Sequence, residues 1–521
     1  MSAAAGAEAS AAAPGATNGP FLTIVVVLAF ANFMQVMDQA VANVSIPAIT
    51  GDLGAAPSQG AWIITSYSIS NAIMVPLTGW IADRWGQVRV FAQATALFAI
   101  TSFLCGVAWS LPSLIAFRVL QGAAGGIMIP LAQALLLGSA PPGKRGMALA
   151  VWSMTTVVAP IAGPLLGGWI TDNFHWSWIF LINVVPGLIA AAAVWQLLHK
   201  RETALRRRPL DRVGVLLLVV WVGLLQVVLD KGNELDWFES PFVVAASVII
   251  VLGFALFLVW ELTDRHPLID LTLFKRRNFV LGVLALSFSF GAFRAGSFIL
   301  PLWLQTQVGY TAEWAGYVLA PSGIMALLLG PLAGRNIDRA PRLLASIAIA
   351  IHGVCMMWRA HFTDSADFYT FALPNFVQGI AMAFFFAPLV SISLGGIEPG
   401  RLAAAAGMQN FIRNLLGSFG TSLSITFWER REALHRTQLA EHVTAASMPS
   451  TDYLGRLGAA GVAPDQAHGL MDRVLTQQAY TLSSNDLYWV TSGIMLSLII
   501  LVWCSKPPFG ARGAAVQQDA D

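Results

Sequence analysis

Charged residues are scarce in this chain. Of its 521 residues, 11% are Asp, Glu, Lys or Arg and 56% are hydrophobic, whereas a soluble protein carries about a quarter charged residues. This composition excludes an ordinary water-soluble domain. Apolar runs of about 20 residues recur along the chain, and each is long enough to cross about 30 Å of hydrocarbon as a helix. The lipid bilayer is therefore the expected surrounding, and the net charge of +2 does not suggest a nucleic acid partner.

Several chemical motifs are missing as well. The three cysteines, Cys105, Cys355 and Cys504, fall in apolar runs without the spacing of a metal or redox site, so we expect buried thiols. The sequence contains no G-x-x-x-x-G-K-[ST] loop, so an ATP-driven pump would need a separate subunit. We expect no metal and no cofactor, and the proton motive force as the energy source.

The apolar runs predict an all-α integral membrane protein with fourteen spans. Six fall in an N-terminal bundle (21–200), two in an inserted pair (201–265) and six in a C-terminal bundle (266–505) that includes a polar external segment, 428–485. We expect 1–20 to be a disordered cytoplasmic tail and 506–521 a second cytoplasmic tail. The predicted spans lie near 22–45, 61–81, 88–109, 113–137, 147–170, 178–198, 213–229, 242–261, 279–304, 314–334, 342–358, 369–396, 402–427 and 486–504.

The distribution of Lys and Arg predicts the orientation. The loops after even-numbered spans contain eighteen of them, and the short loops after odd-numbered spans contain only Lys231 and Arg359. Short cytoplasmic loops keep positive charge, so we expect both termini in the cytoplasm of a bacterial cell and 428–485 outside its inner membrane.

Two motifs recur in the same order in each half. Gly79 to Arg84 closes the second span and Gly330 to Arg335 closes the tenth; Gln121-Gly122 in the fourth span matches Gln378-Gly379 in the twelfth. The recurrence indicates two six-helix bundles related by duplication, an arrangement found in transporters.

Four full charges lie well inside predicted spans: Asp38, Arg118, Arg294 and Arg413. Such residues are costly in hydrocarbon and mark functional sites. Asp38 shares one helical face with further polar residues, which predicts a cavity-lining helix and a proton-coupling role for Asp38; a solvated helix end is the alternative. The polar residues that share this face are Asn32, Gln35, Gln39 and Asn43.

The three intramembrane arginines have different surroundings in the sequence. Arg118 and Gln121 share a face of the fourth span, where Arg118 is expected to respond to the protonation of a carboxylate or to make a structural ion pair. Gln409, Asn410 and Arg413 are predicted to line a cavity. Arg294 stands alone, so it either lines the cavity or extends toward the membrane surface. His352 is interpreted as a packing residue or as a donor to a backbone carbonyl.

Two further segments suggest moving parts. The loop after the second span is predicted to clamp neighbouring helix ends together with the second copy of its motif, although a solvated turn has the same local pattern. The fifth span combines prolines and small residues at four-residue spacing, which favours a pivot or a tight packing surface. The predicted gating residues are Gly79, Asp83, Arg84, Gly86, Arg89, Pro160, Gly163, Pro164, Gly167 and Arg335.

These motifs resemble those of the major facilitator superfamily. Gly79 to Arg89 is similar to its loop motif and Phe117 to Gly122 to its span-four motif, and Gly163 to Gly168 resembles the antiporter motif of drug exporters. Similarity in the first and sixth spans is typical of the fourteen-span drug:proton antiporters. Within that family, the segments around Trp237, Trp260 and Pro507 resemble the EmrB-type multidrug exporters.

The resemblance implies export of hydrophobic toxic compounds in exchange for protons, with a periplasmic membrane-fusion adaptor and an outer-membrane channel as partners. Ser177 departs from the family pattern, and Arg294 leaves the charge preference of the cavity open. An exporter dedicated to one metabolite, siderophore or fatty acid is the alternative. A membrane enzyme is disfavoured because its nearest candidate, the acidic segment from Asp230 to Glu239, has no ligand spacing.

Overall fold

The computed structural model describes residues 18–55, 57–141, 144–203, 205, 209–264, 267–337, 339–444, 447–507 and 509. Most of the two predicted tails lies outside these residues, as do the loop arginines Arg206, Arg207, Arg208 and Arg265, and Arg512. Within the described residues the chain is helical and has no strand. The prediction of an all-α protein is confirmed.

The N-terminal half of the described chain forms six long helices, of which the last is broken into two. An N-cap marks the start of one of these helices, α4. Ser110 precedes this helix, and its hydroxyl accepts a hydrogen bond from the Ser113 N–H. The helices are α1 (Asn18–Asp52), α2 (Pro57–Trp85), α3 (Gln87–Gly106), α4 (Leu111–Ser139), α5 (Arg145–Asn173), α6 (Trp178–Leu181) and α7 (Val184–Leu198), followed by the short helix η1 (His199–Arg201).

Two helices follow as a hairpin, and the remaining ones form the C-terminal half. Asp211 and Thr311 cap two of these helices. The hydrogen bonds that Thr370 donates to the cap Asp367 hold the pKa of that carboxyl below its usual range. The helices are α8 (Arg212–Lys231), η2 (Trp237–Glu239), α9 (Pro241–Thr263), η3 (Leu271–Lys275), α10 (Arg277–Thr306), α11 (Ala312–Asn336), α12 (Pro341–Arg359), α13 (Phe368–Ala383), α14 (Phe386–Leu394), η4 (Pro399–Arg401), α15 (Leu402–Glu441), α16 (Met448–Ala459) and α17 (Pro464–Trp503).

Most of these helices are long and apolar enough to cross a membrane. Among the described residues eleven spans pass on length and hydropathy, and bent α5 makes a twelfth. The predicted spans 61–81 and 402–427 fall on α2 and α15, which are 29 and 40 residues long. Both helices carry many polar side chains, and several of these are buried in the protein interior, among them Ser70 and Asn71 of α2 and Gln409 and Asn410 of α15. The chain is a multi-pass membrane protein.

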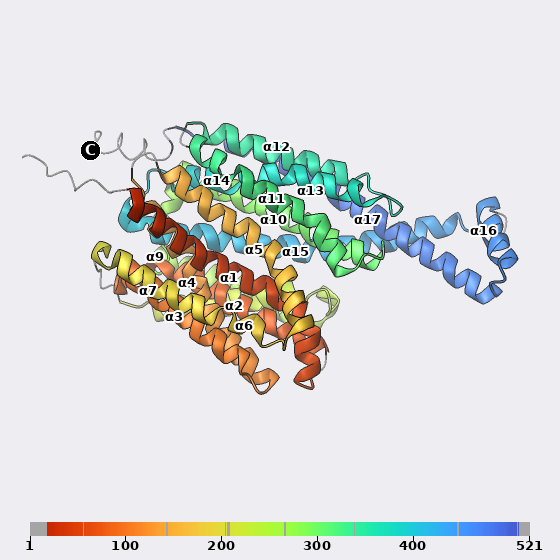
Figure 1. The fold of residues 1–521 in the computed structure, drawn as a ribbon, viewed down its shortest axis with the longest axis horizontal. Helices are drawn as coiled ribbons and strands as arrows, with labels where there is room; N and C mark the ends of the chain where they lie inside the picture. Colours follow the sequence, from red (N-terminus) through yellow and green to blue (C-terminus); the bar gives the residue numbers. More distant parts are fainter. Residues whose placement is uncertain are drawn as a thin grey trace, which may run out of the picture.

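The long helices form two groups (Figure 1). In one, α1 packs on α5, and α4 packs on α2 and α3; in the other, α10 packs on α15, α11 on α13 and α12 on α17. The groups meet along two seams, α2 with α15 and α5 with α11. We call the end where α1 begins and α17 ends the terminal end. The opposite end, from which α16 protrudes, is called the hairpin end, after the turn from α15 through α16 to α17 and not after the inserted pair α8–α9.

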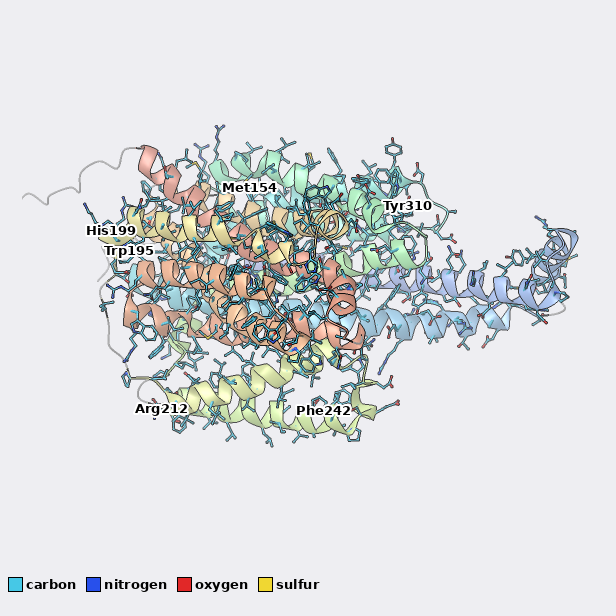
Figure 2. All side chains as sticks on the ribbon, turned by 60° about the horizontal axis from the view of Figure 1, so that its bottom comes forward. Met154, Trp195, His199, Arg212, Phe242 and Tyr310 are labelled. Atoms are coloured by element: carbon cyan, nitrogen blue, oxygen red, sulfur yellow. The ribbon has the colours of Figure 1, made fainter. Side chains whose placement is uncertain are left out.

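The inserted hairpin α8–α9 lies along one side of the molecule. Figure 2 shows it with Arg212 toward the terminal end and Phe242 toward the hairpin end. Helix α8 packs on α2 and α15, so it covers the seam between them. The Ser422 hydroxyl donates to the Leu229 carbonyl at 2.7 Å, and the Trp237 indole donates to Thr426 at 2.9 Å. These bonds attach the hairpin to α15.

The segment 428–485, predicted to be external, is largely helical among its described residues. Helix α15 continues to Glu441, α17 begins at Pro464, and α16 connects them far from the other helices (Figure 1). At the base of this extension the Asp486 carboxylate accepts hydrogen bonds from Arg431 at 2.6 Å and from His435 at 2.7 Å. These parts of α15 and α17 lack the long apolar runs that predict a span, which is why apolarity alone did not reveal that the helices continue.

The two halves share local packing. On α4, the missing side chain of Gly122 leaves room for Ser70 and Tyr67 of α2; on α13, Gly379 leaves room for Ser322 and Met325 of α11. Each pair of helices thus approaches closely at the glycine of the repeated Gln-Gly motif. Two of the cysteines are buried as predicted, but Cys504 is exposed just after α17, so its prediction as a core thiol is wrong.

Candidate functional site

A buried carboxylate and guanidinium lie between α1 and α4. The Arg118 Nη1 atom donates to the Asp38 carboxylate at 2.7 Å, and the two side chains are 0% and 1% exposed. Gln121 donates to the other Asp38 oxygen at 3.1 Å, and Asn183 donates to that oxygen at 2.8 Å. Asp38 therefore accepts three hydrogen bonds, as a buried charge requires.

Arg118 is held on several sides. Its Nε atom donates to the Ile63 carbonyl at 3.2 Å and its Nη1 atom also donates to Gln121 at 2.8 Å. The Tyr67 ring lies 4.2 Å from the guanidinium carbon, a cation–π contact. Its Nη2 atom has no hydrogen-bond partner among the described residues. The guanidinium thus has a carbonyl, an amide oxygen and a ring as partners if the carboxylate becomes neutral.

Asn183 belongs to this cluster but was not among the predicted site residues. It occupies the break between α6 and α7, and its amide donates to Asp38 and, at 3.5 Å, to Ser102. Ser102 also donates to the Phe180 carbonyl at 2.9 Å, which fixes one side of the break. A broken span in a membrane is tolerated where its freed backbone groups find protein partners. A polar Asn inside an apolar run was the available signal.

The polar face of α1 divides into a buried part and an exposed part. Asn32 donates to Thr155 of α5 at 2.5 Å, and Gln35 donates to the Tyr67 hydroxyl at 2.9 Å. Gln39 is half-buried, whereas Asn43 is exposed and donates to the Gln39 carbonyl of its own helix. The face therefore lies between helices near Asp38 and opens toward the hairpin end.

The predicted cavity residues of α15 have three different environments. Gln409 is buried and accepts a hydrogen bond from Ser393 of α14, so it faces its own group. Asn410 donates to Gln133 of α4 at 2.7 Å and so joins the two groups. Both placements differ from the predicted cavity lining, because α15 packs directly on α2 and α4 at this depth. Arg413 is buried beside Phe290 of α10.

Arg294 has a charged neighbour that the sequence did not reveal. The Asp230 carboxylate, from the last turn of α8, lies close enough to interact electrostatically with the Arg294 guanidinium. Asp230 was assigned to a loop because it ends an apolar run. Gln226, four residues earlier on the same helix, donates to Asp230 at 2.9 Å, and this spacing was the available signal.

Arg359 is a further buried arginine, and it was not among the predicted site residues. Arg359, counted with the loops, ends α12 and is 1% exposed. It donates to Asn375 at 2.6 Å and to Gln378, whose amide lies 3.2 Å from the His352 ring nitrogen. His352 packs on Phe293 and Phe385. The cluster contains no described Asp or Glu, so it holds a positive charge with amide oxygens.

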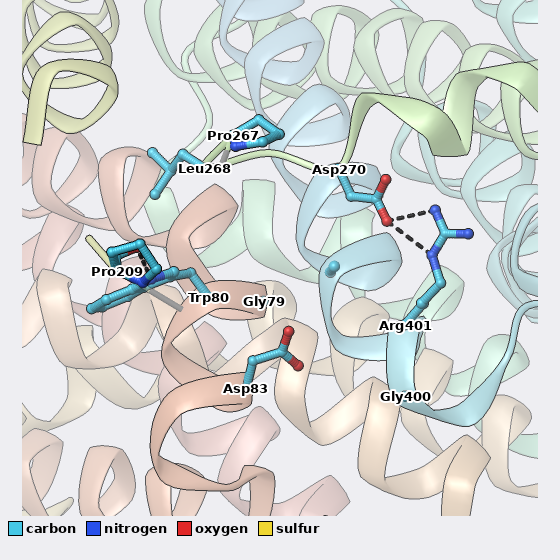
Figure 3. A pocket seen from close by; sticks show the side chains of 10 residues that line it. Gly79, Trp80, Asp83, Pro209, Pro267, Leu268, Asp270, Gly400 and Arg401 are labelled. Atoms are coloured by element: carbon cyan, nitrogen blue, oxygen red, sulfur yellow. Dashed lines mark hydrogen bonds and ion pairs between the residues drawn. The ribbon is translucent and has the colours of Figure 1, made fainter. Parts of the chain in front are cut away.

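Two of the predicted gating residues, Gly79 and Asp83, lie at the contact between the two helical groups. A Cβ atom added to Gly79 of α2 would lie 2.7 Å from the backbone of Ala404 of α15. Asp83 lines a pocket beside this contact with Asp270 and Arg401 (Figure 3), and Arg401 donates to Asp270 at 2.9 Å. The helix ends at the terminal end are therefore packed together in this structure.

Four other predicted gating residues have different places. Arg84 lies over the Trp80 and Trp85 rings of its own helix. Gly86 is the N-cap residue of α3, and its φ of 92° lies in the region that favours glycine. Arg89 is exposed, and its backbone N–H donates to the Glu202 carboxylate at 2.9 Å. Arg335 is exposed at the end of α11. A joint clamp that includes Arg89 and Arg335 is not formed here.

Helix α5 combines packing with a bend. A Cβ atom on Gly163 or Gly167 would run into Ala40 or Val41 of α1, so both glycines are needed for the α1–α5 contact. The exposed Pro160 and Pro164 lie at the bend of 41° between Arg145–Pro160 and Ala162–Asn173. A proline removes one helical hydrogen bond, and this explains the bend.

Comparisons with known proteins agree with this architecture. Residues 28–421 match the Major Facilitator Superfamily. The chain is 46% identical to the multidrug export protein EmrB of Escherichia coli strain K12 (94% of this chain, 96% of that protein) and 45% identical to the fatty acid resistance protein FarB of Neisseria gonorrhoeae (93% and 96%). A structure of the proton:xylose symporter XylE shares the fold, with a TM-score of 0.59 at 13% identity (94% and 96%).

Two helical groups around buried charges define a membrane transporter and not an enzyme. The chain belongs to the major facilitator superfamily and, within it, to the family of the EmrB multidrug export proteins.

Proposed function

We propose that this protein exports hydrophobic toxic compounds of several kinds across a bacterial inner membrane in exchange for protons, with both termini in the cytoplasm. The name of the E. coli relative supports multidrug export, and the excess of Lys and Arg in alternate loops supports the orientation. The observation that carries proton exchange is the fully buried Asp38, which shares its hydrogen-bond network with Arg118, Gln121 and Asn183.

The network suggests how a proton changes the protein. With Asp38 ionised, its charge ties α1 to α4 and to the break between α6 and α7. A proton that arrives from outside removes this charge, and Arg118 then keeps Gln121, the Ile63 carbonyl and the Tyr67 and Phe180 rings as partners. Cargo enters from the cytoplasm or the inner leaflet while Asp38 is deprotonated, and protonation from outside resets the cavity.

Transport by the purified protein in proteoliposomes tests this function. One proton that moves down 100 mV supplies about 2.3 kcal/mol, enough for about 40-fold accumulation of a neutral cargo at about 1.4 kcal/mol per factor of ten. We expect several unrelated neutral hydrophobic dyes to be moved only under an imposed proton gradient, with protons moving the opposite way. Dye movement that persists unchanged after the gradient is collapsed would contradict proton exchange.

A dedicated exporter of one amphiphilic acid is the second candidate. It is favoured by the relative named for fatty acid resistance and by the intramembrane Arg294 and Arg413. The same assay distinguishes the two functions, because a dedicated exporter would move one class of dye and leave the others.

The external extension is the part proposed to contact a periplasmic membrane-fusion adaptor, which in turn would reach an outer-membrane channel. It protrudes beyond the other helices and ends in α16, where Met448 is 83% exposed. We expect a variant in which a short Gly-Ser turn replaces 445–460 to fold and to transport dyes in proteoliposomes, but to lose co-purification of the adaptor. Unchanged co-purification would exclude the tip of the extension as the docking element.

A further inference from the structure

Two arginines lie on α10 and α15 near the inserted hairpin. The Arg294 guanidinium of α10 is within electrostatic range of the Asp230 carboxylate of α8, and the Arg294 Cγ atom lies 3.8 Å from the position of a Cβ atom on Gly417 of α15. Arg413 lies one turn before Gly417. The site is thus enclosed by three helices, and yet the Arg294 and Asp230 side chains are exposed. Both side chains are therefore accessible from the space beside these helices.

The positive charge in this site exceeds the negative charge. Arg413 is 3% exposed, and its Nε and Nη1 atoms have no hydrogen-bond partner among the described residues. Its Nη2 atom donates to Asn414 at 3.2 Å, and its guanidinium carbon lies 5.3 Å from the centre of the Phe290 ring. No described Asp or Glu forms an ion pair with Arg413 or Arg294. A buried charge without a partner is costly, so an arriving anion is favoured here.

The other charge of the same segment is already neutralised. Lys231 is next to Asp230, but its amino group donates to both oxygens of Glu234, at 2.9 and 2.7 Å. Asp230 is therefore the described carboxylate that remains to interact with Arg294. Its partners Gln226 and Thr65 are neutral.

We propose that Arg294 and Arg413 form an anion-binding site for the single negative charge of an amphiphilic cargo, and that Asp230 is the internal counter-ion which this charge displaces. Arg294, being exposed, contacts the anion; Arg413, behind Phe290, adds an uncompensated charge. The rings of Phe290 and Phe293 offer an apolar surface for the adjoining chain of the cargo. This inference rests on the proposed export function, and it gives the inserted hairpin a direct part in cargo selection.

Two variants with opposite expected effects test the proposal. The probes are dansylaminoundecanoate and its methyl ester, which differ only in charge. Arg294→Gln is expected to weaken binding of the carboxylate to the full-length protein by about 10-fold or more, the size of a lost charge-assisted hydrogen bond. Asp230→Asn is expected to strengthen it several-fold, because the competitor is gone. The ester should bind equally to all variants.

Matched variants separate selection from stability. Arg294→Lys keeps the charge and should recover part of the carboxylate affinity, and Glu234→Gln removes a neighbouring carboxylate that faces Lys231 and should change nothing. The proposal would be overturned if Arg294→Gln and Asp230→Asn both weakened binding, and did so equally for the carboxylate and the ester. That result would show that the two residues form a structural ion pair. Binding is measured by dansyl fluorescence without a gradient, so a failure of proton-coupled transport leaves this result interpretable.

Discussion

An Asp38→Asn variant is expected to lose proton-coupled dye efflux by about 100-fold or more while it keeps its helical fold. Asparagine preserves the size of the side chain and a carbonyl oxygen for hydrogen bonds, but it cannot gain or release a proton. It also leaves the buried Arg118 without its counter-ion, a loss that costs about 3–5 kcal/mol when one member of a buried pair is removed. Everted vesicles in which dye accumulation and internal pH are recorded together provide the measurement.

Helix α1 offers a matched control for this variant. Asp52 lies on the same helix but is half-exposed, and it accepts a hydrogen bond from the Trp176 indole at 2.8 Å. Because exposed pairs contribute only about 0–1 kcal/mol, Asp52→Asn should retain efflux close to that of the unchanged protein. Proton movement against dye in the Asp38→Asn vesicles, at the rate of the control, would show that another group couples the two fluxes.

A Gly79→Leu variant is expected to hold the terminal end open. The side chain would have to occupy the space of the Ala404 backbone, which belongs to the other helical group. Overpacking of this kind costs about 1–3 kcal/mol, and about 2 kcal/mol shifts the balance between closed and open forms by about 30-fold. Spin labels on the exposed Arg89→Cys and Leu343→Cys positions, with Cys504→Ser as background, should therefore report longer distances across the terminal end.

The control for this effect is a glycine with free space around it. Gly168 of α5 has nothing within 4 Å of an added Cβ atom, so Gly168→Leu should leave the distance distribution unchanged. Both variants add the same apolar side chain to a membrane helix, and only one adds it at the contact between the groups. An unchanged distribution for Gly79→Leu would mean that the Gly79–Ala404 contact does not limit closure.

Much of the helical framework could be predicted because hydrocarbon imposes it. A span must satisfy its backbone internally and present apolar side chains, so composition alone indicates most of the helices. The same rule does not apply to helices outside hydrocarbon, and the polar stretches of α15 and α17 beyond their apolar runs had no such signal. The break at Asn183 does have a signal in the sequence, because Pro186 has no N–H to donate to the Ile182 carbonyl four residues earlier.

The candidate site was predictable to the extent that rare charges mark it. Asp38, Arg118 and Gln121 stand out in apolar runs, and the structure brings them into one network. Asp230 and Arg359 end their helices, where a sequence cannot distinguish a solvated charge from a buried one. Gln409 and Asn410 share a helical face with Arg413. The side chains that each of them contacts depend on how the two helical groups pack together, and the sequence does not reveal this packing.

The position of the inserted hairpin makes the transporter one-sided toward the lipid. Because α8 packs on both α2 and α15 and the hairpin is bonded to α15 through Ser422 and Thr426, the hairpin covers the contact between the two groups on this side. The opposite seam, between α5 and α11, has no such cover among the described helices. A hydrophobic molecule that diffuses in the bilayer therefore meets the α8–α9 hairpin on one side of the protein and the uncovered contact between α5 and α11 on the other.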